Sequence, residues 1–162
     1  MGSGGARYGA GRPGWRRKCE QKFSLDIRRL QRIGRLKPDQ YFSWSWSYDG
    51  DPSGSVGVRT SEHTVTLDYT WTPRGHEPRP VACRLCISRT ACDYGNTRPW
   101  FVCPECNRRC AVVYGLSGRG NFACRVCQRL AHMSEAESPL DRLWRKVRKI
   151  EALLVDGELK PK

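Results

Sequence analysis

The sequence has little that would support a large apolar core or a membrane span. Only 38% of its 162 residues are hydrophobic, and it contains 16 Gly and 10 Pro. No run approaches the roughly 18 consecutive apolar residues of a transmembrane helix. The first thirty residues carry Arg and Gly where a secretory signal has an apolar segment. We expect a small domain with extensions, neither membrane-spanning nor exported, in the cytoplasm.

Signatures of common catalytic sites are also missing. The histidines His63, His76 and His132 have neither metal-pair nor triad spacing, and no glycine-rich phosphate loop is present. We therefore predict a protein that is not an enzyme. A nuclease, whose residues would converge only in the folded chain, is the less favoured alternative.

Acidic residues are scarce beside basic ones: 16 Asp and Glu stand against 29 Lys and Arg, a formal net charge of +13. The excess is concentrated in residues 1–35, with +8, and in residues 81–133, with +6. Clustered cations bind polyanions because they release the counterions condensed on phosphates. Nucleic acid is the expected partner, and a solvated basic surface is the plainer alternative.

Residues 1–22 are predicted to form a flexible basic arm, because Gly and spaced Arg leave almost nothing to bury. Within this arm, Gly11-Arg12-Pro13 matches the short core of an AT-hook, whose Arg enters the minor groove of A·T-rich DNA. An ordinary disordered tail is the alternative for this segment.

Residues 23–96 predict a short helix followed by an antiparallel β region. Ser24 is placed to cap the helix, and Gly34 is placed to end it. From Tyr41 to Tyr48 aromatic residues alternate with serine, which is the period of a strand with one aromatic face. Further alternating segments are residues 56–58, 65–71 and 81–87. The aromatic face could stack nucleic-acid bases, but a hydrophobic core is the favoured interpretation.

The nine cysteines are the most informative feature of the sequence. Two C-x2-C pairs stand 17 residues apart, the spacing of a four-cysteine zinc site. The predicted ligands are Cys103, Cys106, Cys124 and Cys127. A hairpin between the pairs, from residues 111–114 and 122–123, would complete a zinc ribbon over residues 97–133. We predict one structural Zn²⁺, because a closed four-thiolate site has no open position that could activate water.

The remaining cysteines leave alternatives open. A disulfide framework would need an oxidising compartment and usually an even number of cysteines. A second metal site could use Cys83, Cys86, Cys92 and Cys110. We disfavour that site because Cys83 lies on an alternating apolar segment, where cysteine acts as a small hydrophobe.

Residues 134–162 predict an amphipathic helix and tail. Ser138 and Pro139 form its start, and Leu140, Leu143, Val147, Ile150 and Leu154 recur at helical spacing. Packing on the chain's own sheet or ribbon, with Trp144 as the anchor, is the favoured interpretation. A homodimer through this helix is the alternative.

Phosphate contacts are expected from basic residues of the arm, the ribbon and the last helix. These residues are Arg7, Arg12, Arg16, Arg17, Arg108, Arg109, Arg119, Arg125, Arg142, Arg145, Lys146 and Lys149.

Four segments together resemble a group of zinc-ribbon proteins of bacterial prophages and integrating mobile elements. They are LDIRRL at 25–30, RPWFVCPEC at 98–106, FACRVC at 122–127 and DRLWRKVRKI at 141–150. The resemblance spans residues 20–155 and includes Cys92 and the four predicted ligands, whereas the pair Cys83 and Cys86 departs from it. It implies a bacterial cytoplasmic setting and a mobile-element context.

The sequence as a whole predicts a small α+β zinc-binding protein that binds nucleic acid without catalysis, as an accessory factor of a mobile element. We favour DNA over RNA. The alternative function is an adaptor or inhibitor that docks on a nucleic-acid-processing enzyme.

Overall fold

The fold is known from a computed structural model, which describes residues 16–48, 50–93, 95–115, 120–135 and 138–155. Within these residues the helices are α1 (Ile27–Arg32), α2 (Pro139–Val155) and two short 3-10 helices, Cys19–Gln21 and Met133–Glu135. The strands are β1 (Ser24–Asp26), β2 (Gln40–Tyr48), β3 (Asp51–Thr60), β4 (Thr64–Trp71), β5 (Arg79–Ala91), β6 (Thr97–Val102), β7 (Arg109–Cys110) and β8 (Val112–Tyr114).

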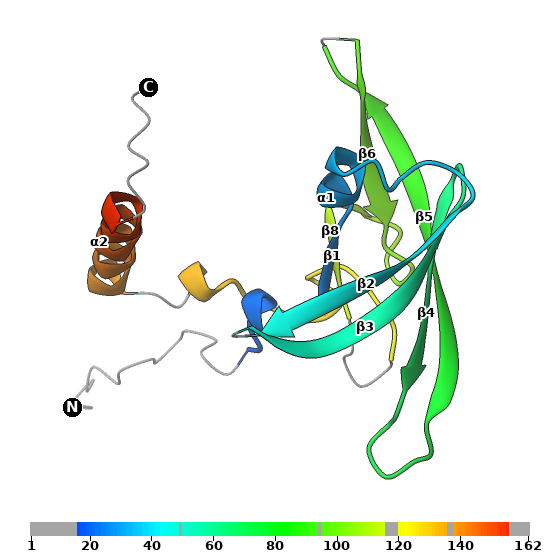
Figure 1. The fold of residues 1–162 in the computed structure, drawn as a ribbon, viewed down its shortest axis with the longest axis horizontal. Coiled ribbons are helices and arrows are strands. Elements are labelled where there is room, and N and C mark those ends of the chain that lie inside the picture. Colours follow the sequence, from blue (N-terminus) through cyan, green and yellow to red (C-terminus); the bar gives the residue numbers. More distant parts are fainter. Residues whose placement is uncertain (1–15, 49, 94, 116–119, 136–137, 156–162) are drawn as a thin grey trace, which may run out of the picture.

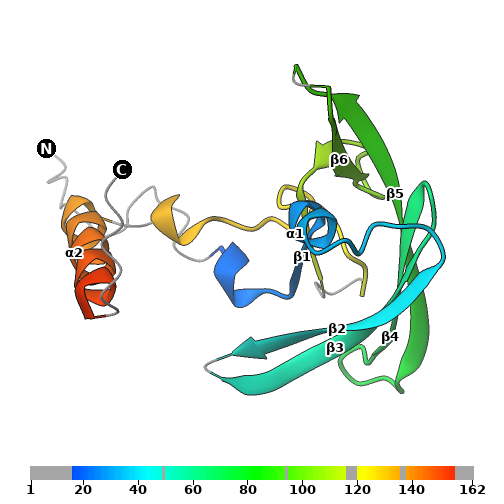
Figure 2. The same cartoon turned by 45° about the horizontal axis from the view of Figure 1, so that its top comes forward.

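Strands β2 to β7 form one antiparallel sheet in sequence order. The sheet curls, so that β2 and β3 lie opposite β5 and β6 across its hollow side (Figures 1 and 2). Helix α1 and the small sheet of β1 and β8 fill that hollow side. The predicted antiparallel β region is therefore confirmed, with the cysteine-bearing segment continuing the same sheet through β6 and β7.

The alternating residues predicted to form strands do form them, and their apolar face is the core. Trp44 is 9% exposed, while Val58, Leu67 and Leu85 are fully buried on neighbouring strands. Trp46 donates its indole N–H to the Ser24 carbonyl over 2.7 Å, which satisfies the polar group of a partly buried ring. The face with Trp44 and Trp46 is thus a core face, as favoured, and base stacking on it is not supported.

The first helix begins two residues later than the sequence indicated. Ser24 lies on β1 instead, and Asp26 caps α1 by accepting a hydrogen bond from the Arg28 N–H at 2.9 Å. Ser24 pairs with Tyr114 across the small sheet, and this long-range pairing overrides the local capping preference. Gly34 does follow the helix in a left-handed conformation, with φ +70°, as expected for a terminating glycine.

The last helix starts where predicted but does not pack as predicted. The Ser138 hydroxyl accepts a hydrogen bond from the Asp141 N–H at 3.1 Å, which caps α2. Trp144 is 54% exposed, and Leu140, Leu143 and Ile150 are each more than half exposed. Trp144 is therefore no anchor against the chain's own sheet. Figure 1 shows α2 set apart from the curled sheet, and none of the described helices is long and apolar enough to cross a membrane.

Candidate metal centre

The first cysteine turn (residues 103–108) directly follows β6. Its backbone closes through the Cys103 N–H, which donates to the Arg108 carbonyl at 2.9 Å, and through the Asn107 N–H, which donates to the Cys103 carbonyl at 2.9 Å. Asn107 has φ +56°, a left-handed conformation that asparagine tolerates better than most residues. Cys103 and Cys106 are thus presented on one side of a tight turn.

The second cysteine turn (residues 124–130) closes in a similar way, with its left-handed residue one position later. The Gln128 N–H donates to the Cys124 carbonyl at 3.0 Å, and Arg129 takes the left-handed conformation with φ +52°. The Gln128 side-chain amide donates to the carbonyls of Tyr114, at 3.1 Å, and Asn121, at 2.9 Å. This buried glutamine therefore ties the second turn to the segment that leads into it.

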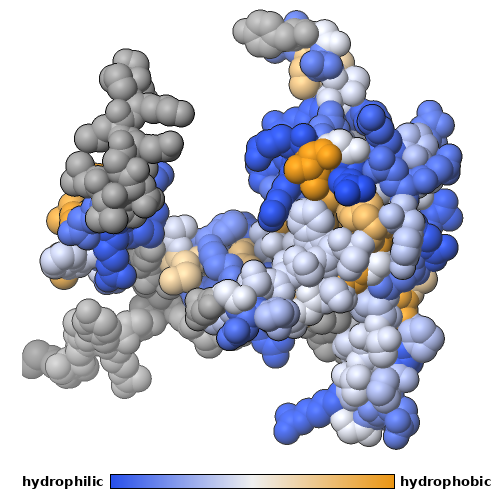
Figure 3. All heavy atoms as spheres, in the orientation of Figure 1, coloured by the Kyte–Doolittle hydropathy of each residue, from blue (hydrophilic) through white to orange (hydrophobic). Residues whose placement is uncertain are grey.

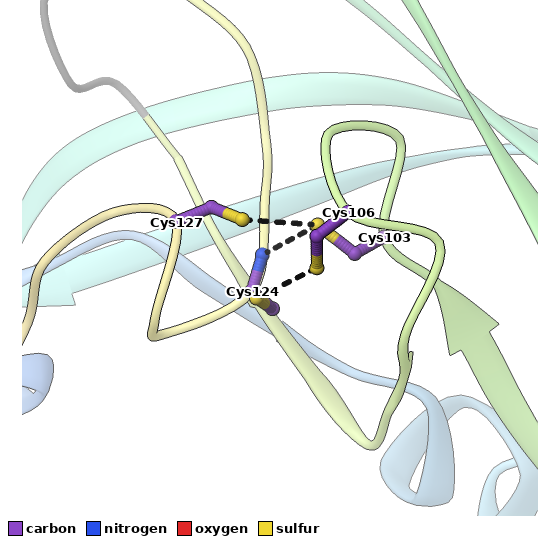
Figure 4. A group of neighbouring side chains, drawn as sticks. All are labelled: Cys103, Cys106, Cys124 and Cys127. Atoms are coloured by element: carbon purple, nitrogen blue, oxygen red, sulfur yellow. Dashed lines mark hydrogen bonds between the residues drawn. The ribbon is translucent and has the colours of Figure 1, made fainter.

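The four predicted ligands come together. Their sulfur atoms all lie within 4.8 Å of one another, with Cys103 to Cys127 at 3.9 Å and Cys106 to Cys124 at 3.7 Å. Figure 4 shows the four thiols converging from the two turns. Metal–sulfur bonds of about 2.3 Å imply tetrahedral sulfur–sulfur edges of about 3.8 Å. The arrangement therefore fits one tetrahedral ion, and four thiolates are a donor set for a soft or borderline metal.

The groups around Cys103 favour the thiolate form of this residue. Burial opposes a charge on Cys103, but the N–H groups of Cys124, Glu105 and Cys106 lower its pKa to about 7. Burial and hydrogen bonds with the other sulfurs raise the pKa of Cys127 above its usual range. Four neighbouring thiols cannot all lose their protons without a compensating cation. A bound divalent metal would supply that positive charge.

Other cysteines are placed differently. Cys110, on β7, packs beside the four-cysteine cluster, and burial together with the nearby sulfurs raises its pKa to about 12. Cys83 is 7% exposed in the main core, whereas Cys86 is exposed on the opposite face of β5. Side chains three residues apart on a strand point away from each other, so these two cannot grip one ion. Cys92 is exposed, and Cys19 is buried beside Tyr114.

The ribbon itself is only partly formed. Between the two cysteine turns, the predicted hairpin is reduced, within the described residues, to a single bridge in which Tyr114 and Ala123 exchange hydrogen bonds of 2.8 and 3.0 Å. The main partner of β8 is β1, and the Ile27 N–H also donates to the Ala111 carbonyl at 3.0 Å. The segment 111–114, which leads toward the second turn, is therefore held by β1 and by the first residue of α1.

Comparison of the chain with protein-family models, curated proteins and solved structures finds no match.

The predicted phosphate contacts fall in three places. Arg108 and Arg109 are exposed at the first cysteine turn, and Arg16 and Arg17 are exposed near the second turn, which itself carries Arg125. The basic residues of α2 are exposed on that helix and form a separate group: Arg142, Arg145, Lys146 and Lys149. Three predicted residues, Arg7, Arg12 and Arg119, lie outside the described residues, as does the Gly11-Arg12-Pro13 motif.

Sequence reasoning missed Arg129. It lies two residues beyond Cys127, and it lines the same cavity as Arg16 and Arg125. Its position in the second C-x2-C turn was a usable signal, because the first turn has Arg108 two residues beyond Cys106.

Proposed function

We propose that the protein is a zinc-containing, non-enzymatic nucleic-acid-binding protein, with DNA preferred over RNA. Zinc is the metal that four cysteines in two C-x2-C turns most commonly hold, and sulfur–sulfur separations of 3.7 and 3.9 Å suit it. With all four positions filled by thiolates, the ion would stabilise the fold and leave no site for an activated water.

The observation that carries the binding proposal is the placement of arginines beside both cysteine turns. Arg108 and Arg109 are exposed at the first turn, and Arg125 and Arg129 belong to the second. A metal bound across the two turns would fix the backbone positions of all four arginines relative to one another. Guanidinium groups suit phosphate because each offers two parallel donors.

A salt titration tests this proposal. The logarithm of the affinity of the zinc-loaded chain for a labelled DNA duplex should fall linearly with the logarithm of the salt concentration. The slope should be about 0.9 for each phosphate neutralised. The double variant Arg108→Gln/Arg109→Gln should bind more weakly and with a slope smaller by roughly 1 to 2. Binding that is absent, or that does not depend on salt, would overturn the proposal.

A matched control variant removes two arginine charges at positions away from the cysteine turns. Arg84 is exposed on the outer face of β5, and Arg74 is exposed in the loop before that strand. The variant Arg74→Gln/Arg84→Gln should retain the slope of the unaltered chain. An equal loss in both double variants would mean that net charge alone, and not the cysteine turns, directs binding.

The adaptor function remains a second candidate because of one observation on α2. Its apolar side chains Leu140, Leu143, Trp144 and Ile150 are each more than half exposed, and Figure 3 shows apolar atoms on the surface of that helix. Such a face suits a protein partner. Capture of a nucleic-acid-processing enzyme that survives nuclease and high salt, and that is lost in Leu143→Glu, would favour this function.

A homodimer through α2, the alternative given for this helix from the sequence, is a proposal of the same kind. Sedimentation of the unaltered chain and of Leu143→Glu decides it. A dimer that the substitution converts to a monomer would support self-association, and a monomer in both would exclude it at the concentrations used.

A further inference from the structure

A cavity of about 360 Å³ lies beside the second cysteine turn, and three arginines line it. Its walls are formed by Arg16, Arg125, Val126, Arg129 and Leu130. We call it the arginine cavity. Its volume lies within the range of sites that bind small ligands, and no acidic residue is among those five.

Backbone pairing brings Arg16 to this cavity from more than a hundred residues away in the chain. The Ala131 N–H donates to the Arg17 carbonyl at 3.0 Å, and the Cys19 N–H donates to the Ala131 carbonyl at 3.0 Å. Residues 16–19 therefore run parallel to the end of the second turn, with Lys18 and Ala131 as bridge partners. The end of the basic arm is thus docked as a wall of the cavity.

The other two arginines are fixed by the turn itself. The Leu130 N–H donates to the Arg125 carbonyl at 3.0 Å, which closes the turn and brings Arg125 and Arg129 to the same cavity. The Arg125 guanidinium also contacts the Glu135 carboxylate at 2.7 Å. One nitrogen of Arg125 is held in this way, and a guanidinium has further N–H groups for a second acceptor.

We propose that the arginine cavity binds a phosphomonoester, as the terminal phosphate of a nucleic-acid strand. This inference rests on the proposed nucleic-acid binding and names the part of the nucleic acid that the second turn recognises. A phosphomonoester carries close to two negative charges at neutral pH, whereas a backbone diester carries one. Three arginines that line one concave site favour the more highly charged group.

The apolar walls suit the sugar or base that a terminal phosphate carries. Leu130 is 5% exposed and Val126 is 55% exposed, so Val126 offers an apolar surface next to the arginines. A sugar or base attached to the bound phosphate could lie against it. A free nucleotide has the same phosphomonoester chemistry, so the experiment must separate a strand end from a free nucleotide.

The test compares two labelled DNA strands of one sequence, one with a 5′-phosphate and one with a 5′-hydroxyl, on the zinc-loaded full chain. We expect the phosphorylated strand to bind about tenfold more tightly. Arg129→Gln and Arg16→Gln should each remove this preference, while Arg84→Gln should keep it. Arg16 lies outside the cysteine turn, so its variant stays informative if Arg129→Gln disturbs the left-handed backbone. Zinc content and melting temperature identify any such disturbance.

The outcomes are separable. Equal affinity for the two strands overturns the inference and leaves the proposed function standing. Failure of both strands and of duplex to bind overturns the proposed function as well. A third arm titrates a nucleoside 5′-monophosphate. An outcome in which the nucleotide binds with an affinity that Arg129→Gln lowers, while the two strands show no end preference, assigns the cavity to a free nucleotide. The strand-end proposal is then wrong.

Discussion

The backbone N–H of Cys124 donates a hydrogen bond to the Cys103 sulfur at 3.3 Å, and this contact joins the two cysteine turns directly. It connects residues 21 positions apart in the sequence. An N–H aimed at a sulfur favours the thiolate over the thiol. The protein backbone therefore lowers the pKa of one ligand and aligns the two turns at the same time.

Substituting a ligand should remove most of the bound metal. Cys103→Ser and Cys124→Ser each remove a thiolate from a four-thiolate site, and a hydroxyl is a poor replacement for it. We expect one zinc ion per unaltered chain and a loss of most of it in both variants, measured by elemental analysis and by native mass spectrometry.

Cys92→Ser is the matched control, since Cys92 is exposed and outside the cluster. It should retain one zinc ion per chain. A second zinc ion that Cys92→Ser removes would instead place a further site among the remaining cysteines.

Removing the metal should loosen the cysteine turns more than the main core. Among the residues that the structure describes, the cluster at the turns buries Ala123 as its only residue besides cysteines, whereas the main core buries residues from five strands of the large sheet and from α1. A small apolar cluster cannot hold two turns together without the ion. Chelator treatment should therefore raise amide hydrogen exchange in residues 103–110 and 124–131 well above that in β3, β4 and β5.

This chelation experiment also tests whether the metal ion has a structural role. A metal-free chain with unchanged exchange throughout would contradict a structural role for the ion. An equal rise in amide hydrogen exchange in the turns and across the sheet would instead mean that the turns and the core unfold as one unit.

Asp26 should contribute a pH-dependent part of stability. Burial opposes its charge, but hydrogen bonds from Arg28 hold the pKa of this carboxyl below 3.8. A lowered folded-state pKa stabilises the fold above the unfolded pKa, and the contribution is lost as pH falls through the folded-state value. Asp26→Ala should cost about 0.5–2 kcal/mol near neutral pH, measured by denaturant unfolding.

The control for this prediction is Asp26→Asn. Asparagine caps a helix about as well as aspartate but carries no charge. It should cost less than alanine near neutral pH, and its stability should converge with that of the unaltered chain as pH falls below 3.8. A difference in stability between Asp26→Asn and the unaltered chain that stays constant with pH would show that the charge of Asp26 does not contribute to stability.

Local patterns in the sequence were sufficient for much of the fold. Alternation over Tyr41–Tyr48 and over 65–71 predicts strands correctly, because one face of each is buried and the period is two. The two C-x2-C turns were equally predictable, since their geometry depends on a few adjacent residues. Local spacing therefore identified the four sulfurs that the structure brings together.

The features that could not be predicted depend on long-range pairing. The small sheet of β1 and β8 joins segments nearly ninety residues apart, and no local signal in Ser24–Asp26 identifies that partner. The docking of Arg17 and Cys19 onto Ala131 is of the same kind, and it creates the arginine cavity. Amphipathic spacing in α2 predicted an apolar face but not what covers it. The cytoplasmic and mobile-element setting stays a prediction from resemblance.

Gly115 should be intolerant of any side chain. A Cβ at this position would lie 2.5 Å from the ring of Phe122, which is 1% exposed, stacks with Trp46 and meets Tyr69 edge-on. A buried ring held between two others cannot move aside, so Gly115→Ala should cost about 1–3 kcal/mol in unfolding free energy.

Gly57→Ala is the matched comparison on β3. There the added Cβ would meet the Tyr41 hydroxyl at 3.0 Å, the far end of a side chain that is 72% exposed. Tyr41 can swing into solvent, and alanine is better than glycine in a strand, so the change should be near neutral or slightly stabilising. A loss for Gly115→Ala no larger than that for Gly57→Ala would mean that the Phe122 ring moves aside as easily as Tyr41 does.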